Sequence, residues 1–515
     1  MTIPPPLGLR RAGTGPEDER PVSIVATLTD RSAADGATPL RPAPEVRCVE
    51  VRADLTGDVD VGAIRANFSG GLLYVLRSTA AGGACDDPEE RRHERLIAAA
   101  GQYDYVELDV ARDLHPTVLD RIAPERRVLS WYGPAVDLDG LQKRFAAMAT
   151  VEAHLYRLAP TADTMAQALV PLLLLKSLDR DDATAYARGP VASWTRVLAA
   201  RYGAAVMFGR LDDDRPDGEL AARRLLADYP HQILSRAEQI NGIIGSAVTM
   251  SLCPLAHNTA YLSLGLPALF LPFSTDELTR SLDELSTGLD ELGLPLHGLC
   301  VVQPFKDTAF SIATETTPFA RRVLAASLLI RSPSGGWWGD VEAASVVAAL
   351  TGNRVEVARK RIAVIGCGGA GRAAAAALTQ AGAWVTMVNR GIRSGLPVAK
   401  RLNLPFVPLY EFDPRAFDVL VHATPVKDTL PFPIDGLDPT VVVFDLTYAA
   451  TETRLTTAAR AAGHRTIDGK EMTLAELSRQ FHRMTGTHIA AEIVRAAQHE
   501  FLQSPPSLPQ GEQQR

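Results

Sequence analysis

One lysine of the chain lies where a side-chain amine could take part in catalysis. Lys306 ends the segment VVQPFK (301–306), in which an apolar run typical of a buried strand leads into a turn. A lysine whose pKa is tuned by its surroundings can donate a proton to a reacting oxygen. A lysine at a strand end is more often an ordinary surface residue, so this segment alone leaves both interpretations open.

A glycine-rich turn offers a second kind of chemistry, the binding of a dinucleotide. An apolar strand at 362–365 leads into GCGGAG (366–371), an alanine-rich helix and a second strand. In such a turn Gly366 permits the tight bend, Gly368 lets the backbone approach a pyrophosphate, and Gly371 lets the helix pack on the strand. The helix N-terminus then faces the phosphates. This order of strand, turn and helix predicts a Rossmann domain.

The end of the second strand favours NADP over NAD. Asn389 and Arg390 stand where an acidic residue would hold the ribose of NAD and repel a 2′-phosphate. Arg390, with Arg393 nearby, can pair with that phosphate, although two solvated loop arginines would give the same sequence. The predicted cofactor-binding residues are Gly366, Gly368, Gly369, Ala370, Gly371, Asn389, Arg390 and Arg393.

Composition narrows the class of protein. The 515 residues are 46% hydrophobic and 22% charged, with a net charge of −7 and no basic block, so nothing favours a nucleic-acid partner. No apolar run is long enough to predict a membrane span. The five cysteines are scattered without a CxxC pair, which predicts neither a metal site nor a disulfide framework. We expect a cytoplasmic protein of two to four domains, with disordered tails at 1–20 and 503–515.

The first half of the chain contains eight short β-branched runs between residues 23 and 211, each separated by room for a helix or a loop. Eight such units predict a (β/α)8 barrel whose functional residues lie at the C-terminal strand ends. Several runs end in polar residues, namely Arg52, Arg77, Asp109, Tyr132 and Arg157. These side chains are either ordinary strand caps or the lining of a pocket.

Two resemblances cover most of the chain. Residues from about 233 to 502 resemble shikimate dehydrogenase in GSAVTMSLCPLAHN (245–258), VVQPFK (301–306), GWWGDVEAA (336–344) and DGKEMTLAELSRQFHRMTG (468–486). Residues 22–230 resemble type I 3-dehydroquinate dehydratase, itself a (β/α)8 barrel, in VEVRAD (49–54), YVLRSTAAGG (74–83) and AHLYRLAPTAD (153–163). Together the two resemblances imply an α/β chain with a barrel at 21–212, a connector at 213–238, a substrate-binding domain at 239–350 and a Rossmann NADP-binding domain at 351–502.

The shikimate dehydrogenase resemblance implies that Lys306 and Asp340 form the catalytic pair. The substrate-binding positions that it implies are Ser251, Cys253, Val302, Ser327, Trp338, Tyr448 and Glu476. The family has a second serine at Cys253, a threonine at Val302, asparagines at Ser327 and Trp338, and a glutamine at Glu476. With so many hydrogen-bonding positions changed, we expect weak binding of shikimate itself. The substrate is then a different small cyclic hydroxy acid, or the site does not turn over.

The barrel resemblance implies lost catalysis. Arg157 occupies the position of the family's Schiff-base lysine, and Tyr132 that of its histidine. Arginine stays protonated in proteins and cannot attack a ketone as an amine, so we expect no dehydratase activity by the lysine mechanism. The barrel residues that could still bind an anionic ligand are Glu50, Arg52, Arg77, Tyr132, Arg157 and Arg196.

Two functions remain open from the sequence. The first is an NADP-dependent oxidoreductase with an inactive barrel, and the second is a ligand-binding regulator that resembles the quinate repressors. The retained glycine turn with Lys306 and Asp340 favours the enzyme. A barrel that serves as a scaffold for a reductase homodimer is compatible with either function.

Overall fold

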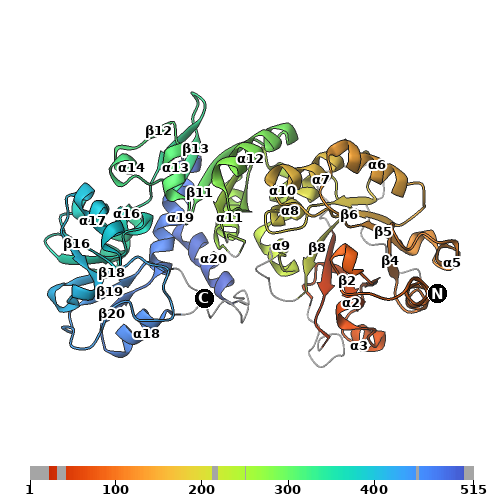
Figure 1. Ribbon diagram of the computed structural model, residues 1–515, viewed down its shortest axis with the longest axis horizontal. Coiled ribbons are helices and arrows are strands. Elements are labelled where there is room, and N and C mark those ends of the chain that lie inside the picture. The colour runs from red at the N-terminus through yellow and green to blue at the C-terminus, as the bar shows by residue number, and fades with distance from the viewer. Residues whose placement is uncertain are drawn as a thin grey trace. The chain divides into compact units, whose positions relative to one another are not determined.

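The structure is a computed structural model that describes residues 23–31, 42–211, 219–246, 248–249, 251–447 and 452–503. The predicted tail at 1–20 and residues 504–515 lie outside the described residues. The described chain forms two compact units (Figure 1). The first holds residues 23–242 and 246–296, and the second holds residues 243–245 and 297–503.

A nearly closed barrel of eight parallel strands opens the first unit, which confirms the predicted strands and the α/β class. The strands are β1 (Ser23–Leu28), β2 (Val46–Arg52), β3 (Gly71–Val75), β4 (Tyr105–Asp109), β5 (Arg127–Trp131), β6 (Leu155–Leu158), β7 (Ala183–Ala185) and β8 (Val206–Arg210). Their order is β7-β6-β5-β4-β3-β2-β1-β8. A hydrogen bond from Ala205 N to Ala183 O (2.9 Å) joins the two ends.

Helices connect the barrel strands and cover their outer face. They are α2 (Ala53–Thr56), α3 (Val61–Arg65), η2 (Thr79–Ala81), α4 (Glu89–Ala99), α5 (Pro116–Leu119), η3 (Pro124–Arg126), α6 (Leu138–Met148), α7 (Met165–Ser177) and α8 (Ser193–Arg201). The local sequence sets where α7 begins: the Thr164 side chain accepts a hydrogen bond from Gln167 N and so caps the helix.

The rest of the first unit packs on the barrel. It contains α9 (Ala222–Asp228), α10 (His231–Arg236), the first part of β9 (Gln239–Gly245), α11 (Cys253–Leu264), β10 (Ala268–Ser274) and α12 (Leu278–Leu292). Helix α12 lies along α7 (Figure 1), where a side chain at Gly288 would overlap that of Leu169. Trp194 meets Phe273 edge to face, with ring centroids 5.4 Å apart. Apolar packing of this density fixes α12 and β10 against the barrel.

A mixed sheet opens the second unit. Residues 243–245, the end of β9, lie beside β11 (Leu296–Val301), which is followed in the sheet by β13 (Leu328–Arg331), β14 (Trp337–Asp340) and β12 (Glu315–Thr316). The β11–β13 and β13–β14 pairs are antiparallel. Helices α13 (Lys306–Ile312) and α14 (Pro318–Val323) belong to the same part of the chain. The segment VVQPFK thus ends a strand and starts a helix at Lys306.

A second sheet, entirely parallel, confirms the predicted Rossmann domain. Its strands are β15 (Arg361–Ile365), β16 (Trp384–Asn389), β17 (Phe406–Pro408), β18 (Val419–His422), β19 (Val442–Asp445) and β20 (Arg465–Ile467). The order β17-β16-β15-β18-β19-β20 has β15 and β18 at its centre, where the direction of the strand order reverses, and this is the dinucleotide-binding arrangement. The helices are α15 (Ala344–Gly352), α16 (Gly369–Gln380), α17 (Ile392–Leu402), η4 (Leu409–Glu411), η5 (Pro414–Ala416), α18 (Arg454–Ala461), α19 (Gly469–Thr485) and α20 (Ala491–Gln503).

No described helix combines the length and the apolar character that crossing a membrane requires. The described residues also contain no group of three or more His, Cys, Asp and Glu side chains suited to hold a metal ion.

Candidate functional site

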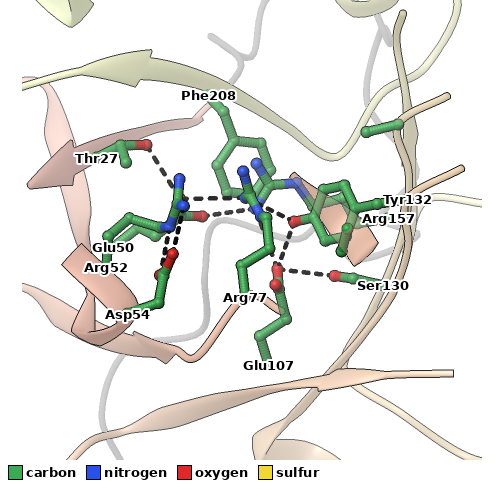
Figure 2. A network of polar contacts seen from close by, with 12 residues as sticks. Thr27, Glu50, Arg52, Asp54, Arg77, Glu107, Ser130, Tyr132, Arg157 and Phe208 are labelled. Atoms are coloured by element: carbon green, nitrogen blue, oxygen red, sulfur yellow. Dashed lines mark hydrogen bonds and ion pairs between the residues drawn. The ribbon is translucent and has the colours of Figure 1, made fainter. Parts of the chain in front are cut away.

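The centre of the barrel holds a buried guanidinium with several acceptors. Arg157, on β6, donates from Nη1 to Glu50 Oε2 at 2.6 Å and to Glu107 Oε2 at 3.2 Å. Its Nε and Nη2 donate to the Tyr186 hydroxyl at 2.9 and 2.6 Å. The guanidinium also lies 3.6 Å from the centre of the Phe208 ring (Figure 2). Neighbouring groups of the chain therefore satisfy the charge and the hydrogen-bond donors of Arg157.

Tyr132 belongs to the same network. Its hydroxyl accepts a hydrogen bond from Arg77 Nη2 (2.9 Å) and donates one to Glu107 Oε2 (2.8 Å). Ser130, two residues earlier on β5, donates to the same carboxylate oxygen at 2.8 Å. In Figure 2, Glu107 is drawn below Arg77 and Arg157, and its carboxylate accepts the hydrogen bonds from Tyr132 and Ser130. The Tyr132 hydroxyl is thus engaged both as a donor and as an acceptor within the network.

Burial and charge act on the pKa values of this network. Burial by itself raises the pKa of Glu50, but the charges of Arg157, Arg77 and Arg52 outweigh it, so the pKa lies below its ordinary value. Burial raises the pKa of Tyr132 well above its ordinary value, against the two neighbouring arginines. Burial works against the charge of Arg157, yet Glu50 and the two tyrosines keep its pKa well above the ordinary value. The site thus keeps Glu50 and Arg157 charged and Tyr132 neutral.

The other predicted barrel residues have partners of their own. Arg52 forms two hydrogen bonds of 2.7 Å with Asp54, and Arg196 donates to Glu219 at 2.6 Å. The charge of Arg196 lowers the pKa of Glu219 to about 2. The structure therefore brings Glu50, Arg77, Tyr132 and Arg157 into one cluster, with Arg52 and Arg196 in pairs beside it.

Sequence reasoning missed three residues of the barrel centre: Glu107, Tyr186 and Arg188. Glu107 lies two residues before the polar strand end at Asp109, and this spacing puts both side chains on one face of β4. Arg188 lies near the end of another predicted run, ATAYARG (183–189). It donates to Ala159 O at 3.0 Å and lies 5.0 Å from the centre of the Tyr132 ring. The period of two along β4 and the end of β7 were signals that could have found two of the three.

The glycine turn of the second unit has the shape that a pyrophosphate requires. Gly366 follows β15 with φ +115°, a conformation that residues with a side chain rarely adopt, and a Cβ there would lie 2.8 Å from Ala423 O. A Cβ at Gly371 would overlap Gly366 O. Gly368 caps α16, and Gly369 and Ala370 are its first residues. The loop and helix N-terminus thus leave backbone N–H groups open to a ligand.

Two arginines follow β16, Arg390 directly after the strand and Arg393 in the first turn of α17 (Ile392–Leu402). Asn389 Nδ2 donates to Gly391 O at 2.9 Å and to Ser394 Oγ at 3.1 Å, so this side chain shapes the turn. Both arginine side chains are exposed, and neither guanidinium makes a hydrogen bond or ion pair with any described residue. Both guanidinium groups are therefore free to meet an anion.

Lys306 lies against the glycine turn. A Cβ on Gly369 would lie 3.2 Å from Lys306 Cδ and 3.3 Å from its Cβ, so the stem of the lysine covers the first residue of α16. The half-buried Lys306 ammonium makes no hydrogen bond or ion pair with the described residues. The next residue, Asp307, is instead held by Arg372 of α16 in an ion pair. This pair fixes the start of α13 beside the dinucleotide turn.

Asp340, at the end of β14, has partners other than Lys306. Its Oδ1 accepts from Thr317 Oγ1 (2.8 Å) and from Val341 N (2.9 Å). Its Oδ2 lies 3.3 Å from Arg483 Nη2 of α19. No ion pair joins Lys306 and Asp340 within the described structure, so the predicted pair is not in contact.

The remaining predicted substrate positions fall in both units. In the first unit, Ser251 Oγ accepts a hydrogen bond from Cys253 N at 3.1 Å. In the second, Val302 N donates to Ile244 O at 3.0 Å, and Ser327 Oγ accepts from Glu342 N at 2.8 Å. Tyr448 lies outside the described residues.

Two further positions of the second unit meet residues of α19. The ring of Trp338 lies 5.6 Å below the guanidinium of Arg483. Glu476 Oε1 accepts from Gln480 Nε2 at 3.1 Å. The sequence pattern had not pointed to Arg483, which lies two helical turns beyond Glu476.

Family models match two stretches of the chain. Residues 24–232 match the model of type I 3-dehydroquinase, and residues 243–329 match that of the shikimate dehydrogenase substrate binding domain. A shikimate dehydrogenase (NADP(+)) of Halobacterium salinarum is 36% identical over 266 residues, which span 50% of this chain and 97% of that protein.

Two similar proteins extend over both halves. The chloroplastic bifunctional 3-dehydroquinate dehydratase/shikimate dehydrogenase of Arabidopsis thaliana is 26% identical over 483 residues, which cover 86% of this chain and 78% of that protein. Among solved structures, the dehydroquinate dehydratase and shikimate dehydrogenase of S. pombe matches with 18% identity and a TM-score of 0.42, over 93% of this chain and 99% of that one.

Proposed function

The chain belongs to the shikimate dehydrogenase family and carries a type I 3-dehydroquinase domain before it, and we propose that it is an NADPH-dependent reductase of 3-dehydroshikimate or a related cyclic hydroxy acid. One observation supports this most strongly. The ammonium of Lys306 has no partner among the described residues, and its stem lies against Gly369 of the dinucleotide turn. An unpaired lysine beside a cofactor turn is available for proton transfer.

The residues at the turn fit an NADP molecule. Gly366 and Gly371 leave no room for side chains where the backbone must approach a pyrophosphate. Arg390 and Arg393 would hold the 2′-phosphate through charge-assisted hydrogen bonds. A bound NADPH would supply the hydride for reduction of a ketone.

Lys306 would act on the oxygen of that ketone. An ammonium within hydrogen-bond reach of the oxygen donates its proton as the carbonyl carbon is reduced, and takes it back in the reverse direction. The aliphatic stem of Lys306 packs on Gly369, which limits the positions that the ammonium can reach. Thus the residue that holds the proton is tied to the turn that would hold the cofactor.

The substrate would be a cyclic hydroxy acid that the altered positions tolerate. Ser327 Oγ already accepts from Glu342 N, and Trp338 presents a ring where the family has an asparagine. Loss of hydrogen-bonding groups weakens the binding of a polar ring. We therefore propose lower affinity for shikimate than its relatives have, with a more apolar ring accepted beside Trp338.

The barrel would not act as a dehydratase by a Schiff base. Arg157 donates to Glu50, Glu107 and Tyr186, and a guanidinium is not an amine nucleophile. The barrel would serve as a structural domain. Its remaining arginines, Arg77 first, are candidates for holding an anion.

The regulatory alternative is not favoured, because the relatives that match the chain are named as enzymes. A cytoplasmic location and a homodimer stay predictions. The oligomeric state would be measured on the purified protein, and the location in its native host cells.

The test is NADPH oxidation by the purified protein with 3-dehydroshikimate, run in parallel with NADH. We expect oxidation of NADPH and a much slower reaction with NADH. Arg390→Ala should raise the KM for NADPH by roughly tenfold, the value of one charge-assisted hydrogen bond, and leave the KM for NADH unchanged. Equal rates with both cofactors would contradict the role of Arg390, and no oxidation of either would contradict reduction of this substrate.

A further inference from the structure

Helix α9 follows the last barrel strand and is fastened to it. Arg210 N, at the end of β8, donates to Leu220 O, two residues before α9, at 2.9 Å. A Cβ on Gly209 of β8 would lie 2.7 Å from Leu225 Cδ1 and 2.9 Å from Ala222 Cα, so the strand and the helix are in close contact. The position of α9 is therefore set by β8.

Arg224 of α9 reaches a loop of the same unit. Its Nη1 donates to Thr249 O at 3.5 Å, and its Nη2 donates to Ser251 O at 3.1 Å. Its Nε and Nη2 also donate to Asp228 Oδ2 at 3.0 and 2.5 Å, within α9. Arg224 is 5% exposed and Asp228 is 1% exposed. A buried guanidinium that a carboxylate of the same helix fixes can hold both carbonyl groups of the loop in place.

A second contact fastens α9 to the helix that follows this loop. Asn258 of α11 donates from Nδ2 to Asp228 O at 2.9 Å and to Phe270 O at 3.1 Å. Its Oδ1 accepts from Phe270 N at 2.8 Å, and the side chain is fully buried. The loop before α11 and the body of α11 are thus both bonded to α9.

Ser251 lies between these two contacts, two residues before α11, and the resemblance to shikimate dehydrogenase makes it a substrate position. Its Oγ accepts a hydrogen bond from Cys253 N at 3.1 Å, and its N donates to Val248 O at 3.0 Å. The hydroxyl donates to no described residue. A serine hydroxyl that already accepts one hydrogen bond can still donate to an anion such as a carboxylate. Where that proton points depends on how the backbone of Ser251 is held.

From these contacts we propose that Arg224 is a positioning residue for the substrate. Through its bond to the carbonyl of Ser251, it fixes the hydroxyl that would meet the carboxylate of the cyclic hydroxy acid. The inference rests on the proposed reductase function and gives the barrel a part in that function. The barrel supports substrate binding without catalysing a reaction itself, because β8 carries the helix that holds this loop.

The first test is steady-state kinetics of ketone reduction by Arg224→Lys, which keeps the charge beside Asp228 but loses the planar fork that spans the two carbonyl groups. We expect the KM for 3-dehydroshikimate to rise roughly three- to tenfold, the range for one lost hydrogen bond. The KM for NADPH and the kcat should stay at their wild-type values. Arg236→Lys, at an exposed position of α10, is the matched control and should change neither KM. An unchanged KM for 3-dehydroshikimate, or an equal rise in both KM values, would overturn the inference.

A second readout does not depend on activity. The amides of Ser251 and Cys253 donate hydrogen bonds within the loop, so their hydrogen–deuterium exchange measures how often the loop opens. Mass spectrometry of peptides should show faster exchange there in Arg224→Lys than in wild type or Arg236→Lys, with no change in β15. Faster exchange in a protein that reduces nothing would reject the reductase and keep Arg224 as the residue that holds the loop. Unchanged exchange would overturn the inference.

Gly209→Ala tests the barrel side of the connection and serves as the second variant if Arg224→Lys does not fold. It leaves the ion pair of α9 intact but places a methyl group against Leu225 and Ala222, which moves α9 relative to β8. The KM for 3-dehydroshikimate and the exchange at Ser251 should both rise. Wild-type values of both in a folded Gly209→Ala protein would contradict a part for the barrel in substrate binding.

Discussion

The barrel centre and the start of α13 each hold a cation, Arg157 and Lys306, and the surroundings of the two cations differ. Arg157 is 3% exposed and makes hydrogen bonds to Glu50, Glu107 and Tyr186. Lys306 is half-buried, and its ammonium makes no hydrogen bond in the described chain. A cation enclosed by its own acceptors stabilises a fold, whereas one left without them can act on a ligand. Under the proposed function, the barrel is structural and the chemistry takes place in the second unit.

The largest effect should come from removing the free lysine. Lys306→Met keeps the apolar stem on Gly369 but loses the proton donor, so kcat for ketone reduction should fall roughly 100- to 10,000-fold, as for loss of a general acid. Steady-state kinetics with NADPH measures the change. The exposed Lys400→Met is the matched control and should leave kcat unchanged.

This prediction has a clear contrary result. If Lys306→Met kept most of the wild-type kcat while its circular dichroism stayed native, Lys306 would not be the proton donor. The contrast between a structural Arg157 and a catalytic Lys306 would then no longer hold.

The second effect concerns the paired arginine. Arg157→Met leaves Glu50 and Glu107 buried without their common cation, which costs about 3–5 kcal/mol of unfolding free energy. The kcat of the remaining folded protein should not change, because Arg157 lies in the first unit. Urea unfolding gives the stability, and active-site titration with NADPH gives kcat per folded molecule.

A surface pair provides the control for Arg157. Arg180 is 38% exposed and pairs with Asp182 at 2.5 Å, so Arg180→Met should cost no more than about 1 kcal/mol. Equal losses for both variants would mean that burial does not set the value of the Arg157 network. A gain of dehydratase activity in Arg157→Lys would show that the barrel retains the rest of its catalytic machinery.

How much of this could be read from the sequence depends on the distance between partners along the chain. The strands and the glycine turn follow from local patterns, and the positions of Arg157 and Lys306 follow from short motifs. Their partners do not. Arg157 meets Glu107 across 50 residues, and Arg483 meets Asp340 from a helix near the end of the chain. Such contacts depend on barrel closure and on side-chain rotamers, which no local pattern specifies.

The smallest effect is a difference in pH dependence between the two regions. The pKa of Glu50 is lowered in the folded state, so its stabilising contribution is present above the unfolded pKa of about 4.3 and is lost as the pH falls through the folded pKa. The pKa of Glu476 is raised by desolvation, so its contribution is present below about 4.3 and is lost as the pH rises through the folded value.

Gln substitutions separate these two contributions. Glu50→Gln should destabilise the protein more at about pH 7 than at about pH 4, and Glu476→Gln should be relatively more stabilising at the higher pH. Urea unfolding of wild type and both variants at the two pH values gives the differences. The same pH trend in both variants would mean that the two sites do not differ in electrostatic character.

The most direct test of the whole account is a single assay in which the purified protein meets NADPH and 3-dehydroquinate. The account predicts that NADPH stays unchanged, because the barrel cannot form the 3-dehydroshikimate that the second unit reduces. Addition of an independent type I dehydratase should then start NADPH oxidation. Oxidation before that addition would contradict a non-catalytic barrel, and a lack of oxidation after it would contradict the reductase.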